Sequence, residues 1–352
     1  MLTVFERRNW ESKNPMVSIA MITYNHVHHI TQAIEGVLSQ KTSFPFELII
    51  GEDCSIDGTG DLVFSYQNKY PNIIRVITSD RNVGMMRNFC RVTEACKGKY
   101  IAFCEGDDYW TDPCKLRKQV DFLEQNPDYA MVHTDSAVLM QGSGKFYKSS
   151  NKRLKGLPKE IPSGFIYDFL LMADVVGIGT LTVLARRSVV MDAQREIGLA
   201  EASWKMGDYP LWLEIAKHHK IKYIDETTAV YRYLDNSASH SKDKQRNFEF
   251  RKDVFDVRFH FIKKYGAAPA TVMSLKKDYN EMLLNHVINL NDRKILSNHP
   301  LFEDAEVDHK IACLRLGVKY PWLRRFAWIY IRIAYFARIY IRIAYFGIRR
   351  LL

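Results

Sequence analysis

The sequence predicts an α/β fold, in which helices flank a mostly parallel central sheet and a helical extension follows. Short apolar runs alternate with segments of helical periodicity, the pattern that right-handed βαβ units produce. Three of these apolar runs end in polar clusters, and the carboxyl ends of parallel strands are where such sheets bind ligands. The chain has 352 residues, of which 47% are hydrophobic and 26% charged. This composition is that of a globular protein with one large or two modest domains.

The expected elements follow from apolar periodicity. Strands are expected at Met16–Thr23, Phe46–Gly51, Ile73–Thr78, Tyr100–Cys104 and Tyr129–Asp135. Helices are expected at Val27–Gln40, Thr59–Tyr70 and Met85–Ala95, and another ends near Gln125. Residues 141–162, rich in Gly, Ser, Lys and Pro, predict a loop. Beyond it we expect an apolar stretch at Val175–Ala185, a helix at Asp208–His219, strands at Ile221–Asp225 and Ala229–Tyr233, and two long helices between residues 242 and 293.

This pattern predicts four parts. They are a leader (1–15), an α/β domain (16–240), a helical extension (241–308) and a basic tail (309–352). The six cysteines form no CxxC pair, and the first residues lack the apolar stretch of a signal peptide. No run of about 18 uncharged apolar residues occurs. We therefore expect a cytoplasmic protein with reduced thiols and no conventional membrane-spanning helix.

The positive charge is concentrated at one end. The chain has 50 Lys and Arg against 40 Asp and Glu, and ten of those basic residues, with no acidic one, lie between His309 and Leu352. The remainder is neutral, which argues against a nucleic-acid-binding face. On a helix of 100° per residue the tail arginines gather on one side, opposite aromatic and aliphatic residues. A basic amphipathic helix on an anionic membrane surface is the favoured interpretation. The repeat IYIRIAYF, at Ile329–Phe336 and Ile339–Phe346, also fits a β-hairpin or a helix docked on the body.

The polar strand ends are the candidate site. Glu105, Asp107 and Asp108 follow one expected strand, and a divalent cation such as Mg²⁺ or Mn²⁺ would offset the repulsion between their carboxylates. A solvated acidic turn is the alternative. Glu52 and Asp53 follow another strand, where an acidic residue commonly accepts ribose or base hydrogen bonds or caps the next helix.

In combination these motifs resemble the family 2 glycosyltransferases, which have the GT-A fold and use nucleotide-sugar donors. The resemblance covers about Met16–His240 and is closest to bacterial enzymes of capsular and lipopolysaccharide synthesis. Five matching stretches occur in the family's order: VSIAMITYNH near residue 20, FELIIGEDCSIDGT at 46–59, NVGMMRNF at 82–89, GKYIAFCEGDDYW at 98–110 and GDYPLWLEIA at 207–216.

The resemblance implies a role for each matched residue. It implies that Thr23, Tyr24 and Asp53 hold the nucleoside with Glu52 beside them, and that Arg87 and Asn88 lie near the nucleotide. It further implies that Asp107 and Asp108 bind the metal that clamps the donor diphosphate, and that Asp208 is the catalytic base. Glu105 stands where the family has an aspartate. Smaller candidates are Asp135, facing an acceptor, and His240, near the metal or diphosphate; at a helix start, Asp208 also fits a simple N-cap.

The leading hypothesis is therefore a metal-dependent inverting transferase that moves a sugar from a UDP-sugar to a saccharide or lipid-linked acceptor in surface-glycan synthesis. It would work at the cytoplasmic face of the membrane. A sugar-nucleotide pyrophosphorylase would need a Gly-rich basic loop after the first strand, which TYNHVHHI does not supply. A non-catalytic, membrane-recruited module that binds nucleotide sugars is the remaining alternative.

Overall fold

The computed structural model describes residues 14–149, 161–172, 178–199, 203–234, 243–290 and 295–303, together with residues 315, 318 and 319. The chain separates into two compact units, Met1–Phe250 and Arg251–Leu352. The boundaries expected at residues 15, 240 and 308 remain predictions. The leader as far as residue 13 and nearly all of the basic tail lie outside the described residues.

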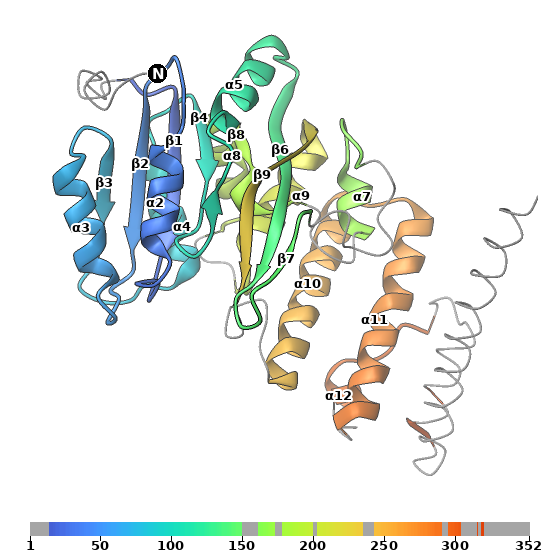
Figure 1. Ribbon diagram of the computed structural model, residues 1–352. Helices are drawn as coiled ribbons and strands as arrows, with labels where there is room; N and C mark the ends of the chain where they lie inside the picture. The colour runs from blue at the N-terminus through green and yellow to red at the C-terminus, as the bar shows by residue number, and fades with distance from the viewer. Residues whose placement is uncertain are drawn as a thin grey trace, which may run out of the picture. The chain divides into compact units, whose positions relative to one another are not determined.

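The first unit is built on one sheet (Figure 1). Its strand order in the described residues is β3-β2-β1-β4-β8-β6-β9-β5, with β7 paired to β6. β3, β2, β1 and β4 are parallel, and β6 and β9 are parallel to each other. β8 is antiparallel to both β4 and β6, so the two parallel groups point the same way. The expected mostly parallel sheet is confirmed. The strands are β1 (Val17–Thr23), β2 (Phe46–Glu52), β3 (Ile74–Ile77), β4 (Tyr100–Phe103), β5 (Tyr109–Trp110), β6 (Tyr129–Met140), β7 (Lys145–Tyr147), β8 (Leu184–Arg186) and β9 (Lys220–Tyr233).

Helices cover both faces of this sheet, so its central strands are buried on both sides and are almost continuously apolar. One face packs Ile19 of β1 against Ile34 in a core shared with α2, α3 and α5. On the other face Phe103 of β4 stacks on Phe89 of α4 and meets the edge of Trp212 in α9. The helices are α2 (Ile30–Leu38), α3 (Thr59–Lys69), α4 (Met85–Ala95), α5 (Lys115–Gln125), α7 (Tyr167–Met172), α8 (Arg187–Glu196) and α9 (Asp208–His218).

Three segments differ from the sequence-based expectation. The two strands expected at 221–225 and 229–233 are one strand, β9, which follows β6 through several register shifts. The expected loop after residue 141 begins as a hairpin, because β7 pairs back on β6. The apolar stretch around residue 180 contains a short 3₁₀ helix, η1 (Thr180–Thr182), directly before β8.

The second unit contains the two long helices that the sequence predicts. They are α10 (Lys244–Tyr265), which begins within the first unit, and α11 (Pro269–Leu290); a short α12 (Ile295–Asn298) follows. Tyr279 of α11 meets Phe255 of α10 edge to face at 5.6 Å. The Asn280 side chain exchanges hydrogen bonds with both backbone groups of Phe302. Across the described residues, no helix combines the length and the apolar character that crossing a membrane requires.

Candidate active site

The acidic turn, Glu105–Asp108, follows β4 and lies directly on the end of β1. Gly106 N–H donates to Ile22 O at 2.9 Å. A side chain at Gly106 would place its Cβ 2.6 Å from Thr23 Oγ1 and 2.8 Å from Thr23 Cβ, which is too close for any real contact. Glycine is therefore required where the acidic turn crosses Thr23.

Asp108 joins the acidic turn to β9. Its Oδ1 accepts a 2.7 Å hydrogen bond from the backbone N–H of Arg232, and the side chain is buried. Burial raises the pKa of Asp108 well above its usual value, and repulsion from Asp107 and Glu105 adds to the effect. Arg232 opposes the shift only in part.

Asp208, the first residue of α9, meets the acidic turn from the other side. Its Oδ2 accepts a hydrogen bond from Thr180 Oγ1 and its Oδ1 one from Tyr209 N–H, both at 2.8 Å. Burial raises the pKa of Asp208, and these two hydrogen bonds work against that rise. Burial, followed by repulsion from Asp107 and Asp208, raises the pKa of Glu105 to about 8. The fold thus gathers carboxylates from two distant parts of the sequence.

This arrangement suits a cation that is shared with a ligand. Among the described residues Glu105 Oε2 is buried without a hydrogen-bond partner, and its neighbours Asp107 and Asp108 are carboxylates too. Hard oxygen donors with unbalanced negative charge favour Mg²⁺ or Mn²⁺. No three of the described His, Cys, Asp and Glu side chains are placed to hold a metal ion together. A cation here would need further ligands, and the phosphates of a substrate are the usual source.

The ends of β1 and β2 form interlocked loops beside the acidic turn. Asn25 N–H donates to Ser55 Oγ, and Asn25 Oδ1 accepts from Ile56 N–H, each at 3.0 Å. Asn25 (φ 55°) and Cys54 (φ 61°) both have left-handed backbone conformations, which non-glycine residues adopt rarely and mostly at functional sites. Of the two nucleoside candidates on β1, Thr23 is buried under Gly106, whereas Tyr24 is 43% exposed. Tyr24 is thus the one available to a ligand.

Glu52 and Asp53 are buried, and their carboxylates accept hydrogen bonds from backbone N–H groups. Glu52 accepts hydrogen bonds from Cys54 N–H and Ser55 N–H, which keeps its own loop folded. Asp53 accepts from the N–H groups of Val83 (2.8 Å) and Gly84 (3.0 Å), so its carboxylate fixes the loop before α4. Both side chains lie at the end of β2, and the contacts they make hold the loops there; their predicted contact with a nucleoside stays a prediction.

The two candidates on α4, Arg87 and Asn88, differ in burial. Arg87 is exposed, but Asn88 is buried, and its Nδ2 donates to Gly51 O at 2.8 Å. Arg91, one turn later, points toward β2: it donates to Glu52 O and lies 3.7 Å from Asp53 Oδ1. Asn88 Oδ1 in turn accepts from Arg91 Nε. The structure therefore brings Arg91 and Asn88 together behind β2.

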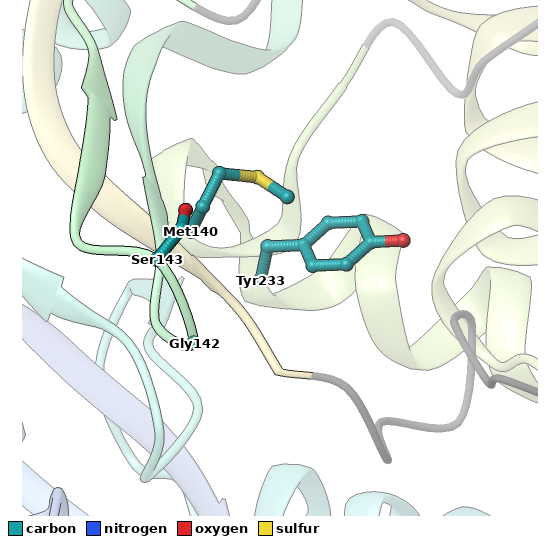
Figure 2. A pocket seen from close by; sticks show the side chains of 4 residues that line it. All are labelled: Met140, Gly142, Ser143 and Tyr233. Atoms are coloured by element: carbon teal, nitrogen blue, oxygen red, sulfur yellow. The ribbon is translucent and has the colours of Figure 1, made fainter.

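The two smaller candidates, Asp135 and His240, are placed only in part. Asp135 is buried in β6 and accepts from Ser136 N–H and Ser149 Oγ, and His240 lies outside the described residues. A cavity of about 310 Å³ lies at the ends of β6 and β9. Figure 2 shows the Met140 and Tyr233 side chains that line it. Gly142 and Ser143 complete its lining. The adjoining Gln141 accepts from Arg232 Nη1, so the cavity lies next to the support of Asp108.

Sequence reasoning missed three residues of this region: Arg91, Thr180 and Arg232. Thr180 lies within an apolar run, where a threonine gives no signal beyond β propensity. Arg91 shares a helix face with Arg87, four residues earlier, and spacing alone does not say which of the two turns toward β2. Arg232 contributes through its backbone, which no side-chain motif encodes.

Comparisons with known proteins identify relatives of the chain. Residues 18–191 match the family described as glycosyl transferase family 2. The putative teichuronic acid biosynthesis glycosyltransferase TuaG of Bacillus subtilis is 30% identical over 259 residues, which are 72% of this chain and 92% of that protein. A glucosyltransferase of Escherichia coli that acts on α-D-GlcNAc-diphosphoundecaprenol with UDP-Glc, WfgD, is 27% identical over 245 residues, 68% of this chain and 85% of that one. An uncharacterized protein of Mycobacterium tuberculosis is 33% identical over 67% of this chain, and the match spans 64% of that relative's length.

Solved structures share the fold at low identity. Staphylococcus aureus TarS 1–349 in complex with UDP-GlcNAc superimposes with a TM-score of 0.51 at 15% identity, over 86% of this chain and 79% of that one. The mannosyltransferase PcManGT of Pyrobaculum calidifontis, in complex with GDP-Man and Mn²⁺, gives 0.51 at 13% identity, over 91% and 87%. These likenesses confirm the expected GT-A fold. The 30% identity to TuaG, over 92% of that protein, together with the family match over residues 18–191, shows that the chain belongs to glycosyl transferase family 2.

Proposed function

We propose that this protein is a metal-dependent inverting glycosyltransferase that moves a sugar from a UDP-sugar to a saccharide or lipid-linked acceptor in surface-glycan synthesis. The observation that carries the proposal is the meeting of Asp208 with the acidic turn, Glu105–Asp108. Family membership supports the reaction class. Residues 16–240 would form the catalytic domain.

Asp208 is the proposed base. Its carboxylate would accept the proton of an acceptor hydroxyl while that oxygen attacks the anomeric carbon. The bond from the anomeric carbon to the nucleoside diphosphate breaks in the same step, and the diphosphate leaves with the electron pair. Attack from the face opposite the leaving group inverts the anomeric centre. A pKa raised by burial suits this task, because a carboxylate of ordinary pKa is a weak base at neutral pH.

Asp107 and Asp108 are the proposed metal ligands, with the donor diphosphate completing the coordination. Mn²⁺ or Mg²⁺ bound there would neutralise the charge that develops on the leaving group. Tyr24, exposed at the end of β1, would contact the nucleoside, and the buried Glu52 and Asp53 would shape the surrounding loops. Arg87 is the exposed side chain at the start of α4 that would approach the nucleotide. A neighbour of the same fold is known with GDP-Man and Mn²⁺, which supports a metal-assisted nucleotide site.

The first test is a screen of nucleotide sugars. The purified chain should release nucleoside diphosphate from one UDP-sugar with Mn²⁺ or Mg²⁺, and EDTA should abolish the release until excess cation is added. An NMR coupling constant of the transferred sugar should then show an inverted anomeric configuration. Donor binding without turnover, on any acceptor tried, would favour a non-catalytic binding module instead.

The acceptor and the membrane belong to the same proposal. A relative acts on a sugar linked to diphosphoundecaprenol, which supports a lipid-linked acceptor. The ten basic residues between Lys310 and Arg350 would hold the enzyme on the anionic cytoplasmic surface where such an acceptor lies. Replacing Arg332, Arg338 and Arg342 by Gln in the full chain should reduce sedimentation with anionic vesicles at low salt. Equal sedimentation of the parent and this variant would remove the membrane role.

A further inference from the structure

The Asp208 carboxylate is held at both oxygens. Tyr209 N–H donates to Oδ1 and Thr180 Oγ1 donates to Oδ2, both at 2.8 Å. A carboxylate oxygen has two lone pairs, so one on each oxygen stays available for a substrate hydroxyl. The Tyr209 bond comes from the helix to which Asp208 itself belongs. Of the two, the Thr180 bond is the one that ties the carboxylate to another part of the fold.

We propose that Thr180 is a positioning residue for Asp208, whose hydroxyl fixes the direction in which the carboxylate faces the acceptor. This inference rests on the proposed function, because it takes Asp208 to be the base. Thr180 itself is 8% exposed. Its carbonyl accepts from Val183 N–H at 3.1 Å, within the 3₁₀ helix η1.

Two side chains that follow the acidic turn in the sequence, Trp110 and Gln119, hold η1 in place. Trp110 Nε1 donates to Leu181 O at 2.8 Å, and Gln119 Nε2 donates to Thr182 O at 2.8 Å. Both side chains are buried. They satisfy two carbonyls of a segment that is too short to satisfy them internally.

Lys115 contacts both of these side chains. Its side chain is fully buried, its Nζ donates to Gln119 Oε1 at 2.6 Å, and the ammonium lies 4.5 Å from the centre of the Trp110 ring. The oxygen of the Gln119 amide thus faces Lys115, and the amide nitrogen faces Thr182 O. The buried amide bridges Lys115 and η1.

The consequence is a link between the two halves of the site. Trp110 follows Asp108 by two residues, so the strand that continues the acidic turn also holds the segment that carries Thr180. The Thr180 hydroxyl also lies beside Glu105 of the acidic turn. Without this hydroxyl, the Asp208 carboxylate is held by one hydrogen bond fewer, and its other orientations become accessible.

The experiment compares Thr180→Val, which keeps the shape and removes the hydroxyl, with Thr180→Ser, which keeps the hydroxyl. Thr180→Val should lower kcat about 10- to 100-fold, the cost of a hydrogen bond to a charged group, with the donor KM unchanged. Thr180→Ser should restore most of kcat. Thr93→Val is the matched control: it removes a buried hydroxyl in α4, bonded to Phe89 O and Gln194, and should leave kcat unchanged.

The second arm repeats Thr180→Val in an Asp208→Asn background. If Thr180 acts through Asp208, the added substitution should lower the residual rate no further. An equal loss in both backgrounds, or a Thr180→Val enzyme with the parent's kcat, would overturn the inference. A parent that transfers no sugar from any donor would instead contradict the proposed function, so the two failures are distinguishable.

Discussion

Asp108 and Arg232 are 124 residues apart, yet the backbone N–H of Arg232 donates a 2.7 Å hydrogen bond to Asp108 Oδ1. The Arg232 guanidinium lies 4.7 Å from the centre of the Tyr109 ring and donates to Gln141. The end of β9 is thereby attached to the acidic turn both through the backbone and through a side chain. Asp108 therefore has a structural task at Oδ1, and under the proposed function its Oδ2 would bind the cation.

These two tasks separate in different substitutions. Asp108→Asn keeps an oxygen for Arg232 N–H but removes the negative charge, so we expect a folded protein that has lost metal-dependent donor binding. Asp108→Leu leaves the buried N–H without an acceptor and should also lower the free energy of unfolding by about 1–3 kcal/mol. Calorimetric titration with Mn²⁺ and donor, and urea unfolding, measure the two effects. Asp121→Asn, at an exposed position on α5, is the control for charge removal. Unaltered metal-dependent donor binding in Asp108→Asn would remove Asp108 from the metal site.

Asp208 predicts the acid side of the pH–rate profile. A base must be ionised to accept a proton, and burial raises the pKa of this carboxyl above its ordinary 3.8. Activity should therefore be complete above the raised pKa and fall as the pH decreases through it, by about tenfold per pH unit. The measurement is kcat at saturating donor, acceptor and cation between pH 4 and 8, within the range where the fold is stable. A kcat that stays constant down to pH 4 would contradict the assignment.

His133 predicts a loss of stability in acid. Its ring is buried in β6 beside Tyr223, and within the described residues neither ring nitrogen has a hydrogen-bond partner. Burial lowers its pKa from 6.5 to about 3. Between these two pH values the imidazole is protonated in the unfolded chain but neutral in the folded chain. Its contribution to the free energy of unfolding is therefore complete above pH 6.5 and declines as the pH falls.

The test compares urea unfolding at pH 7.5 and pH 5.0. Between them the parent should lose about 2 kcal/mol more of its free energy of unfolding than His133→Leu does. His28→Gln, which changes an exposed imidazole, should behave as the parent does. Equal pH dependence of the parent and His133→Leu would show that this imidazole is not kept neutral by burial.

Gly106 tests how tightly the acidic turn lies on β1. An alanine Cβ would lie 2.6 Å from Thr23 Oγ1, so one backbone segment must move. Gly106→Ala should lower the free energy of unfolding by about 1–3 kcal/mol, as overpacking does, and should weaken donor binding because Asp107 moves with the turn. Thr23→Gly in the same chain should recover part of both losses, since it removes the two contacted atoms. Gly106→Ala with parent-like stability and donor affinity would mean that the turn adapts freely.

Much of the fold could be predicted from the sequence because its first half is regular. Strands β1, β2 and β4 are buried almost throughout and mostly apolar, so their limits are expected within one or two residues, and α4 is predicted at its observed bounds. β9 was divided in two because its central residues are polar and exposed. Its continuity comes from pairing with β6, a tertiary contact that local periodicity does not contain.

The residues of the candidate site could be predicted where a carboxylate directly follows a strand. The residues that hold those carboxylates by hydrogen bonds could not. Asp107, Asp108 and Asp208 come together as the motifs indicate, although their roles remain predictions. Thr180 and the backbone of Arg232 were not predictable, since each acts through a hydrogen bond made across the fold. Such contacts depend on the packing of η1 and β9, for which the sequence has no separate signal.

The most direct test of the central claim, that Asp208 and the acidic turn form one transfer site, is to measure donor binding and turnover together in Asp208→Asn. The substitution keeps the side chain's shape and leaves Asp107 and Asp108 in place. We predict a Kd for the donor with Mn²⁺ close to that of the parent, and a kcat reduced by about 10²- to 10⁴-fold, the usual contribution of a general base. A variant that binds the donor and turns it over at the parent's rate would contradict the account.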